Sequence, residues 1–291
     1  MFPVLRRARG RGRTLQPGEA ILYPSLILSD GVSPAMSSLK RASRLVASVF
    51  STTPPPSLRG SVASHRAYIL LDSPSSPSDS AFPSRFSTPL QRALQLQVTR
   101  WGGIVNFAWT GSQTSNIEST SVTAFSPLGG HIHFPNLSLS NLDEVAEKLR
   151  QHATDPPAMN ASEELHIYVC THGARDCRCG DLGGKVFRAL REDLDRRVLA
   201  DPTGPAKSVV LGEVGHVGGH TFAANILVFP HGEWLGQLTP EVVPRVLDAI
   251  LSRERRPFTA LDTPTCPEFW RGRMGLPKAE QLSLHASSQL T

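Results

Sequence analysis

Short apolar runs alternate with helical apolar stripes between residues 65 and 252, a pattern typical of α/β proteins. The continuous apolar runs predict buried strands at residues 67–72, 104–109, 165–169 and 208–214. Apolar residues three or four apart predict helices at 88–100, 140–150, 184–199 and 239–251. Glycine- and proline-containing turns predict two hairpins, 122–125 with 131–134 and 222–229 with 234–238. Ser140 and Thr239 occupy the expected N-cap positions of their helices, with Pro240 first in the latter.

The two halves repeat one order of elements: strand, helix, three strands, helix. That order matches a thioredoxin-like sheet, in which a βαβ unit is followed by a hairpin and a helix. We therefore expect a cysteine-free thioredoxin-like half at residues 65–156 and a second thioredoxin-like domain at 163–252. One continuous α/β domain is the alternative. Residues 253–291 read as a polar C-terminal tail that contains the segment WRGRMG at 270–275.

Residues 1–64 differ in composition from the rest of the chain. They hold nine Lys and Arg against two acidic residues, a net charge of +7, and residues 37–50 can form a basic amphipathic helix. This composition is typical of a mitochondrial transit peptide and predicts a protein of the matrix or intermembrane space. The alternative is a disordered extension on a cytoplasmic protein.

Charge and cysteine content exclude several functional classes. The whole chain carries +5, so residues 65–291 carry −2, which argues against a nucleic-acid-binding body. No apolar run approaches the roughly 18 residues of a membrane span. Three of the four cysteines fall in one short loop, which favours reduced thiols over a disulfide framework.

Two motifs predict a metal centre. Cys170 and Cys179 form C-x8-C after one predicted strand, and His216 and His220 form H-x-G-G-H after another. Ligands in open α/β sheets gather at the carboxyl ends of strands, so these four side chains can converge. Two thiolates and two imidazoles suit tetrahedral zinc, and they also suit an iron–sulfur cluster of mixed ligation.

The remaining candidates have weaker signals. Cys177 and Cys179 form C-x-C rather than the C-x-x-C of thiol–disulfide oxidoreductases, which leaves thiol redox chemistry as an alternative. Cys266 reads as an ordinary cysteine, and Trp270 and Arg271 as residues that cover the metal centre or anchor the tail. The histidines expected to have structural or solvated roles are His166, His172 and His231.

The segments CTHGARDCRCG, GHVGGHTFAANILVFPHGEWLGQLTPEVVPRVLDAIL and WRGRMG resemble the sucrase/ferredoxin-like family, of the actin-patches-distal and altered-inheritance-of-mitochondria type. The resemblance implies a thioredoxin-like ferredoxin whose [2Fe–2S] cluster is held by Cys170, Cys179, His216 and His220. It implies an electron carrier rather than an enzyme, working with a redox partner protein that the family does not identify. No carboxylate pair is placed for glycoside hydrolysis, so "sucrase" has no support.

Imidazole ligation has two expected consequences. Replacing two thiolates by neutral imidazoles makes a cluster less negative and raises its potential. A ligating imidazole also keeps a second ring nitrogen that can ionise, so we expect reduction to be coupled to protonation.

Overall fold

The computed structural model describes residues 56–83, 87–111, 119–156, 158 and 163–289. The predicted helix at 37–50 and most of the predicted extension at 1–64 lie outside these residues. Residues 54–291 form one compact unit of mixed α/β structure.

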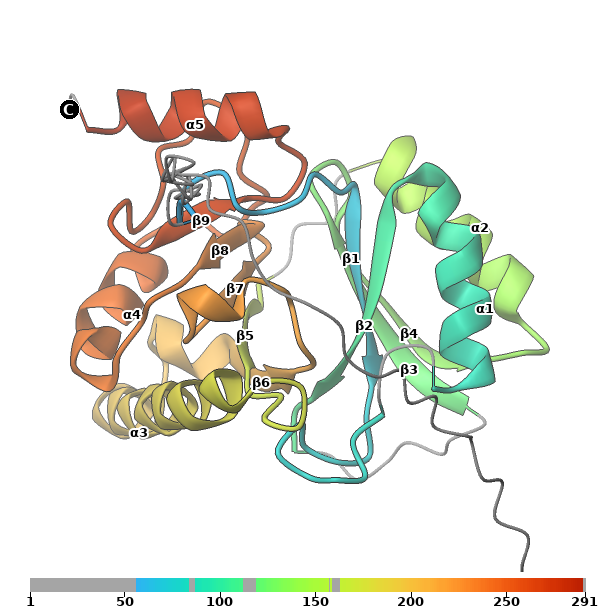
Figure 1. Cartoon of the computed structure of the whole chain (residues 1–291), viewed down its shortest axis with the longest axis horizontal. Coiled ribbons are helices and arrows are strands. Elements are labelled where there is room, and N and C mark those ends of the chain that lie inside the picture. The colour runs from blue at the N-terminus through green and yellow to red at the C-terminus, as the bar shows by residue number, and fades with distance from the viewer. Residues whose placement is uncertain (1–55, 84–86, 112–118, 157, 159–162, 290–291) are drawn as a thin grey trace, which may run out of the picture. The chain divides into compact units, whose positions relative to one another are not determined.

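Both halves follow the predicted order of elements (Figure 1). The first half consists of β1 (Ala67–Asp72), α1 (Pro89–Val98), β2 (Gly103–Trp109), β3 (Ser119–Ser126), β4 (Gly130–Ser138) and α2 (Leu142–Thr154). The second consists of β5 (Leu165–Cys170), α3 (Gly184–Ala200), β6 (Val209–Val214), β7 (Ile226–Phe229), β8 (Glu233–Leu235) and α4 (Val243–Leu251). The predicted strands, helices and hairpins of residues 65–252 are thus confirmed, with boundaries shifted by a few residues.

One mixed sheet of nine strands runs through both halves, in the order β4-β3-β1-β2-β6-β5-β7-β8-β9. In each half the first two strands are parallel, and the third lies antiparallel to the first. Among the described residues, strand pairing links the two halves where Ala108 and Trp109 of β2 pair with Val214 and Glu213 of β6. The predicted division into two thioredoxin-like domains remains a prediction, because the sheet is continuous.

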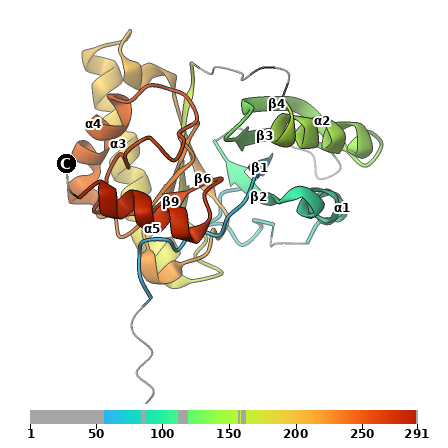
Figure 2. The ribbon, with the colours of Figure 1, turned by 90° about the horizontal axis from the view of Figure 1, so that it is seen from above.

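Three clusters of buried hydrophobic residues hold the helices and the sheet together. One lies between α1, α2 and the first four strands, and another between α3, α4 and the strands of the second half. Figure 2 shows the two helix pairs on opposite outer sides. The third cluster fills the space where the two half-sheets face each other, and Phe125 of β3 stacks there on Phe229 of β7 with ring centroids 4.2 Å apart. The sheet is therefore folded toward itself, which brings residues of non-neighbouring strands into contact.

Helix capping differs from the sequence prediction in two places. The N-cap of α2 is Asn141 and not Ser140, and its Oδ1 accepts the backbone N–H of Ser138 instead of an N–H of the helix. Thr239 precedes the turn Pro240–Val242 as expected, but its hydroxyl donates to the carboxylate of Glu241 and lowers the pKa of that group. The α1 helix does have a side-chain cap, because Thr88 Oγ1 accepts the N–H of Gln91 at 3.2 Å.

The prediction of a polar C-terminal tail is wrong. The segment contains strand β9 (Trp270–Arg273) and helix α5 (Lys278–Ser287). Strand β9 pairs with β8 at the edge of the sheet. The hydropathy pattern does not predict this strand, because two of its four residues, Arg271 and Arg273, are charged. Both are buried, since Arg273 pairs with Glu233 and Arg271 with Asn225.

Candidate metal centre

Cys170 is the last residue of β5, a strand whose side chains are all buried. The thiol is 1% exposed, and the backbone N–H of Cys170 donates to Asn225 O at 3.0 Å. Antiparallel pairing with β7 and parallel pairing with β6 hold this strand on both sides. The sulfur therefore occupies a rigid position at the carboxyl end of a central strand.

The loop that follows returns Cys179 to the end of β5. The backbone N–H of Cys179 donates to Asp176 O at 3.0 Å, and a π-helical turn, Cys179–Gly183, leads from this cysteine into α3. Gly180 packs so closely on Gly173 that a Cβ atom would lie 2.8 Å from the Gly173 Cα. Cys179 becomes fully buried, whereas Cys177, two residues earlier, is exposed.

The histidine loop follows β6, the strand beside β5. His216 is held by its backbone N–H, which donates to Nδ1 of His172 at 3.2 Å. Gly219 has a φ of +67° and lies against the Arg271 guanidinium where a Cβ would overlap it, so this position needs glycine. The two motifs thus lie at the carboxyl ends of the neighbouring central strands β5 and β6.

Three of the four predicted ligands come together. The ligand atoms of Cys170, Cys179 and His216 all lie within 4.8 Å of one another. Cys179 Sγ lies 3.8 Å from His216 Nδ1. His220 lies on the outer, more exposed side of this group. Its ring stacks on that of His216 with centroids 5.8 Å apart. Its Nδ1 lies 3.6 Å from Asp176 Oδ2.

The two buried thiols have pKa values shifted in opposite directions. The pKa of Cys170 lies well below its usual range, because the thiol of Cys179, the ring of His216 and the backbone N–H groups of Val217 and His172 all stabilise its thiolate. The pKa of Cys179 is raised, because Cys170 accepts its proton and because the thiol is desolvated. The pair thus readily holds one negative charge in a site screened from water.

A model of the sucrase/ferredoxin-like family matches residues 58–272. The chain belongs to this family.

Two yeast relatives are similar to this chain over a minority of its length. Altered inheritance of mitochondria protein 32 of Meyerozyma guilliermondii is 30% identical over 113 residues, which is 38% of this chain and 38% of the relative. Actin patches distal protein 1 of Saccharomyces cerevisiae is 30% identical over 119 residues, 39% of this chain and 38% of the relative. The chain thus spans less than two fifths of the length of these relatives.

Among solved structures, a thioredoxin-like [2Fe-2S] ferredoxin from Aquifex aeolicus is 21% identical, with a TM-score of 0.24. The comparison covers 31% of this chain and 83% of the ferredoxin.

Arg271 is a buried cation beside the cysteines of this sucrase/ferredoxin-like protein. Its guanidinium donates to Gly218 O at 3.1 Å, to Asn225 Oδ1 at 2.9 Å and to Ser61 Oγ at 3.1 Å. Burial lowers the pKa of Arg271 to about 10, an effect opposed by the negative charge of the two cysteines. Such a pKa leaves the side chain charged at neutral pH, so it can offset the charge of the thiolates.

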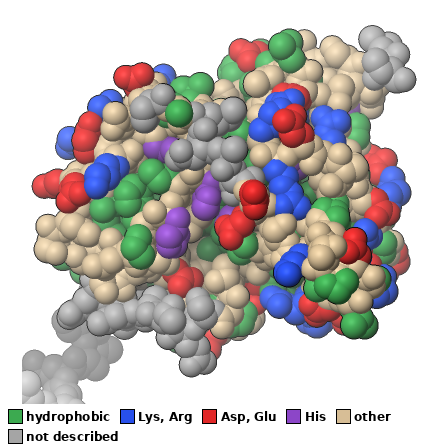
Figure 3. Space-filling model, turned by 180° about the vertical axis from the view of Figure 1, so that it is seen from behind, with side chains coloured by type: hydrophobic (Ala, Val, Ile, Leu, Met, Phe, Trp, Pro, Cys, Tyr) green, Lys and Arg blue, Asp and Glu red, His purple; other side chains and the backbone are tan. Residues whose placement is uncertain are grey.

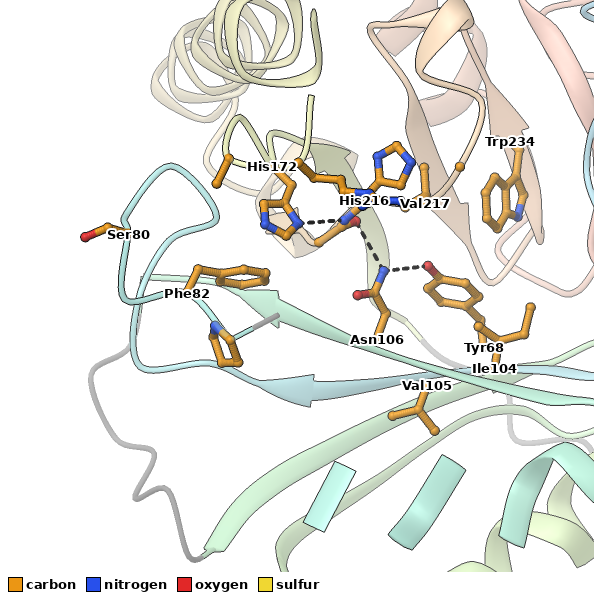
Figure 4. A pocket seen from close by; sticks show the side chains of 15 residues that line it. Tyr68, Ser80, Phe82, Ile104, Val105, Asn106, His172, His216, Val217 and Trp234 are labelled. Carbon is orange, nitrogen blue, oxygen red and sulfur yellow. Dashed lines mark hydrogen bonds between the residues drawn. The ribbon is translucent and has the colours of Figure 1, made fainter. Parts of the chain in front are cut away.

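A cavity of about 700 Å³ borders the histidine loop (Figure 4). Asn106 lies in this cavity and donates to Gly215 O at 3.2 Å and to Tyr68 Oη at 3.0 Å. Both Asn106 and Tyr68 belong to the first, cysteine-free half, as Figure 4 shows. The first half therefore contributes directly to the position of the loop that carries His216.

Sequence reasoning missed the roles of Asn106, Asn225 and Asp176, because no local motif distinguishes these residues from other polar ones. His172 was expected to be a loop histidine and supports His216 through its ring nitrogen. Cys266 lies apart, in the core beneath α4, where burial raises the pKa of its thiol to about 12. Such a thiol is unreactive, which agrees with the ordinary role expected for it.

Proposed function

We propose that this protein is a one-electron carrier whose [2Fe–2S] cluster is held by Cys170, Cys179, His216 and His220. The observation that carries the proposal is the convergence of two buried thiols and an imidazole from two loops, beside a buried arginine. Membership of a family described as sucrase/ferredoxin-like supports it. The protein would have no substrate to turn over and would act with a redox partner protein.

The donor set fits such a cluster. Thiolates are the ligands that iron–sulfur clusters require, and Cys170 is already stabilised as a thiolate. In a cluster with two cysteines and two histidines, Cys170 and Cys179 would bind one iron, and His216 and His220 the other. Rieske centres of this composition have potentials of roughly −150 to +300 mV, against about −400 mV for plant-type ferredoxins. We expect a potential in the higher range.

The surrounding residues would position and tune the cluster. Arg271 would offset negative charge, and the backbone N–H groups of His172 and Val217 would donate to the ligating sulfur of Cys170. Asp176 lies where it can orient His220, since its carboxylate is 3.6 Å from the His220 Nδ1. Coupling between reduction and protonation of an imidazole ligand remains a prediction.

The test is a visible spectrum of anaerobically purified protein, with iron, sulfide and zinc measured on the same sample. We expect a red-brown protein with about two irons and two sulfides per chain, as a [2Fe–2S] centre requires. A colourless protein with one zinc bound to sulfur would overturn the proposal and indicate a structural zinc scaffold.

A mitochondrial location is proposed on two grounds. Relatives bear the name altered inheritance of mitochondria protein, and residues 1–64 have the composition of a transit peptide. No helix in the described part of the chain is long and apolar enough to cross a membrane. Fractionation of cells that express the full chain with a C-terminal tag would test the location, and a purely cytosolic signal would contradict it.

A further inference from the structure

A second group of metal-binding side chains lies between the two half-sheets. It consists of His131 in β4, His166 in β5 and Glu164 just before β5. Each offers one ligand atom, and these atoms lie within 4.8 Å of one another, as do those of Cys170, Cys179 and His216. Strands β4 and β5 are far apart in the order of the sheet, so the fold of the sheet toward itself creates this group.

The spacing suits a single ion. His166 Nε2 lies 3.3 Å from Glu164 Oε2, and the rings of His131 and His166 have centroids 5.0 Å apart. Zinc binds imidazole nitrogen and carboxylate oxygen at about 2.0–2.2 Å, so two ligands of a tetrahedral ion lie roughly 3.4 Å from each other. The measured separation is close to that value without any movement of the side chains.

A supporting contact orients one of the rings. His166 Nδ1 lies 3.3 Å from the hydroxyl of Tyr168, which is itself buried. Metal-bound histidines usually make such a hydrogen bond through the nitrogen that does not bind the ion. With Nδ1 bonded to Tyr168, the Nε2 atom of His166 faces Glu164 and can bind an ion.

The surroundings favour a cation. A cavity of about 580 Å³ adjoins the group, and the described residues that line it include Asp72, Glu164 and three histidines but neither lysine nor arginine. Burial lowers the pKa of His166 to about 3, and it also lowers the pKa of His131, so both rings are neutral near pH 7. Figure 3 shows histidine and acidic side chains close together near the middle of the face opposite to that in Figure 1.

We propose that His131, Glu164 and His166 form a binding site for a divalent transition-metal ion, with Zn²⁺ as the ion that suits two imidazoles and one carboxylate. Three protein ligands leave the fourth position of a tetrahedral ion to water from the cavity. The site joins β4 of the first half to β5 of the second, so a bound ion would cross-link the two halves. It shares no residue with the cysteine-containing centre and does not depend on the function proposed for that centre.

The test is zinc binding by the full chain. The purified protein is dialysed against Zn²⁺, its zinc content is measured, and the zinc is examined by X-ray absorption. We expect one tightly bound zinc surrounded by nitrogen and oxygen at about 2.0–2.2 Å, with no sulfur at about 2.3 Å. Zinc bound only at a site that contains sulfur would mean that the ion occupies the Cys170 centre and not this group, and it would overturn the assignment, as would a failure to bind zinc.

Variants test each ligand. Glu164→Gln changes a side chain that is 53% exposed, so it should leave the fold intact. Loss of a residue that only supports a metal ligand weakens metal binding roughly 10- to 100-fold. Loss of the Glu164 carboxylate, a direct ligand, should weaken zinc binding by at least that factor. His131→Ala should do the same.

His133→Ala is the matched control, because His133 lines the same cavity two residues along β4 but is not one of the three grouped residues. It should bind zinc as the unmodified protein does. Equal affinity in Glu164→Gln and the unmodified protein, or an equal loss in His133→Ala, would overturn the proposal.

Discussion

The guanidinium of Arg271 donates a hydrogen bond to Oδ1 of Asn225 over 2.9 Å, and both side chains are buried. Asn225 in turn donates to Gly219 O at 3.1 Å, and its own carbonyl accepts the N–H of Cys170 at 3.0 Å. One asparagine thus connects the edge strand β9, the histidine loop and the strand that ends in Cys170. Arg271 is consequently linked to the candidate metal centre both through its charge and through the position of the loop.

Arg271→Gln should lower the midpoint potential of the proposed cluster. Reduction adds a negative charge, and the nearby cation stabilises the reduced state, so its removal favours the oxidised state. We expect a decrease on the order of 50 mV, close to the ~59 mV that a tenfold change in equilibrium corresponds to for one electron. Potentiometric titration measures it.

Arg245→Gln is the control for the Arg271 variant. Arg245 lies on the surface, where it pairs with Glu268, so its replacement removes the same charge without a contact to the site. Arg271→Lys keeps the charge but loses the forked geometry and should shift the potential less. An unchanged midpoint in Arg271→Gln, or the same shift in Arg245→Gln, would show that Arg271 has no specific effect.

Replacing either ligating histidine by cysteine should also lower the potential. A thiolate makes the cluster more negative than a neutral imidazole does, and the gap between Rieske centres and plant-type ferredoxins suggests a decrease on the order of 100 mV or more per ligand. His216→Cys and His220→Cys are compared by potentiometric titration and by visible spectra.

His133→Cys serves as the control for these variants, because His133 is exposed on β4 and belongs to neither ligand motif. Its midpoint should stay near that of the unmodified protein. The result for His220→Cys is the more informative one, since the ring of His220 lies beside Asp176 on the outer side of the group. An unchanged potential in that variant would exclude His220 as a ligand.

Buried His65 should make the protein less stable in weak acid. Burial lowers its pKa from 6.5 to about 4, although its Nδ1 lies 2.7 Å from Ala63 O. Between these two values the unfolded chain binds a proton that the folded chain does not, so the free energy of unfolding falls as the pH falls. From pH 7 to pH 5 this residue should account for a loss of about 2 kcal/mol.

Urea unfolding of His65→Asn at both pH values tests this effect. The variant should be less stable at pH 7, because its side chain no longer contacts the rings of Tyr68 and Trp234. The gap to the unmodified protein should narrow by about 2 kcal/mol at pH 5. His133→Asn, at an exposed position, provides the comparison, and a constant gap for His65→Asn would argue against the prediction.

Two cap substitutions should differ in their effects on stability. Thr88→Ala removes the hydroxyl that accepts the N–H of Gln91 and should cost about 1 kcal/mol in the free energy of unfolding. Ser140→Ala removes only an exposed hydroxyl that bonds to Ser138 and should cost less than about 0.5 kcal/mol. Urea unfolding at pH 7 compares them, and equal costs would mean that Ser140 does cap α2.

Much of this protein could be read from local spacing. Apolar periodicity predicted the elements of both halves, since strands and helices bury side chains at fixed intervals along the chain. The spacing of Cys170 and Cys179, and of the two histidines in H-x-G-G-H, predicted the candidate metal centre, because each pair lies within one short segment of the chain. The capping of α2 was mispredicted, because Asn141 and Ser140 are both common N-cap residues and only the backbone geometry distinguishes them.

Local sequence patterns did not predict the features that join the two halves. Strand β9 carries Arg271 and Arg273, whose burial depends on partners 46 and 40 residues away. His131 and His166 meet because the half-sheets face each other and are joined through pairing at the ends of β2 and β6. Local periodicity reports which face of an element is buried, but it cannot report which distant element covers that face. That choice follows from how side-chain shapes and charges match across the whole fold.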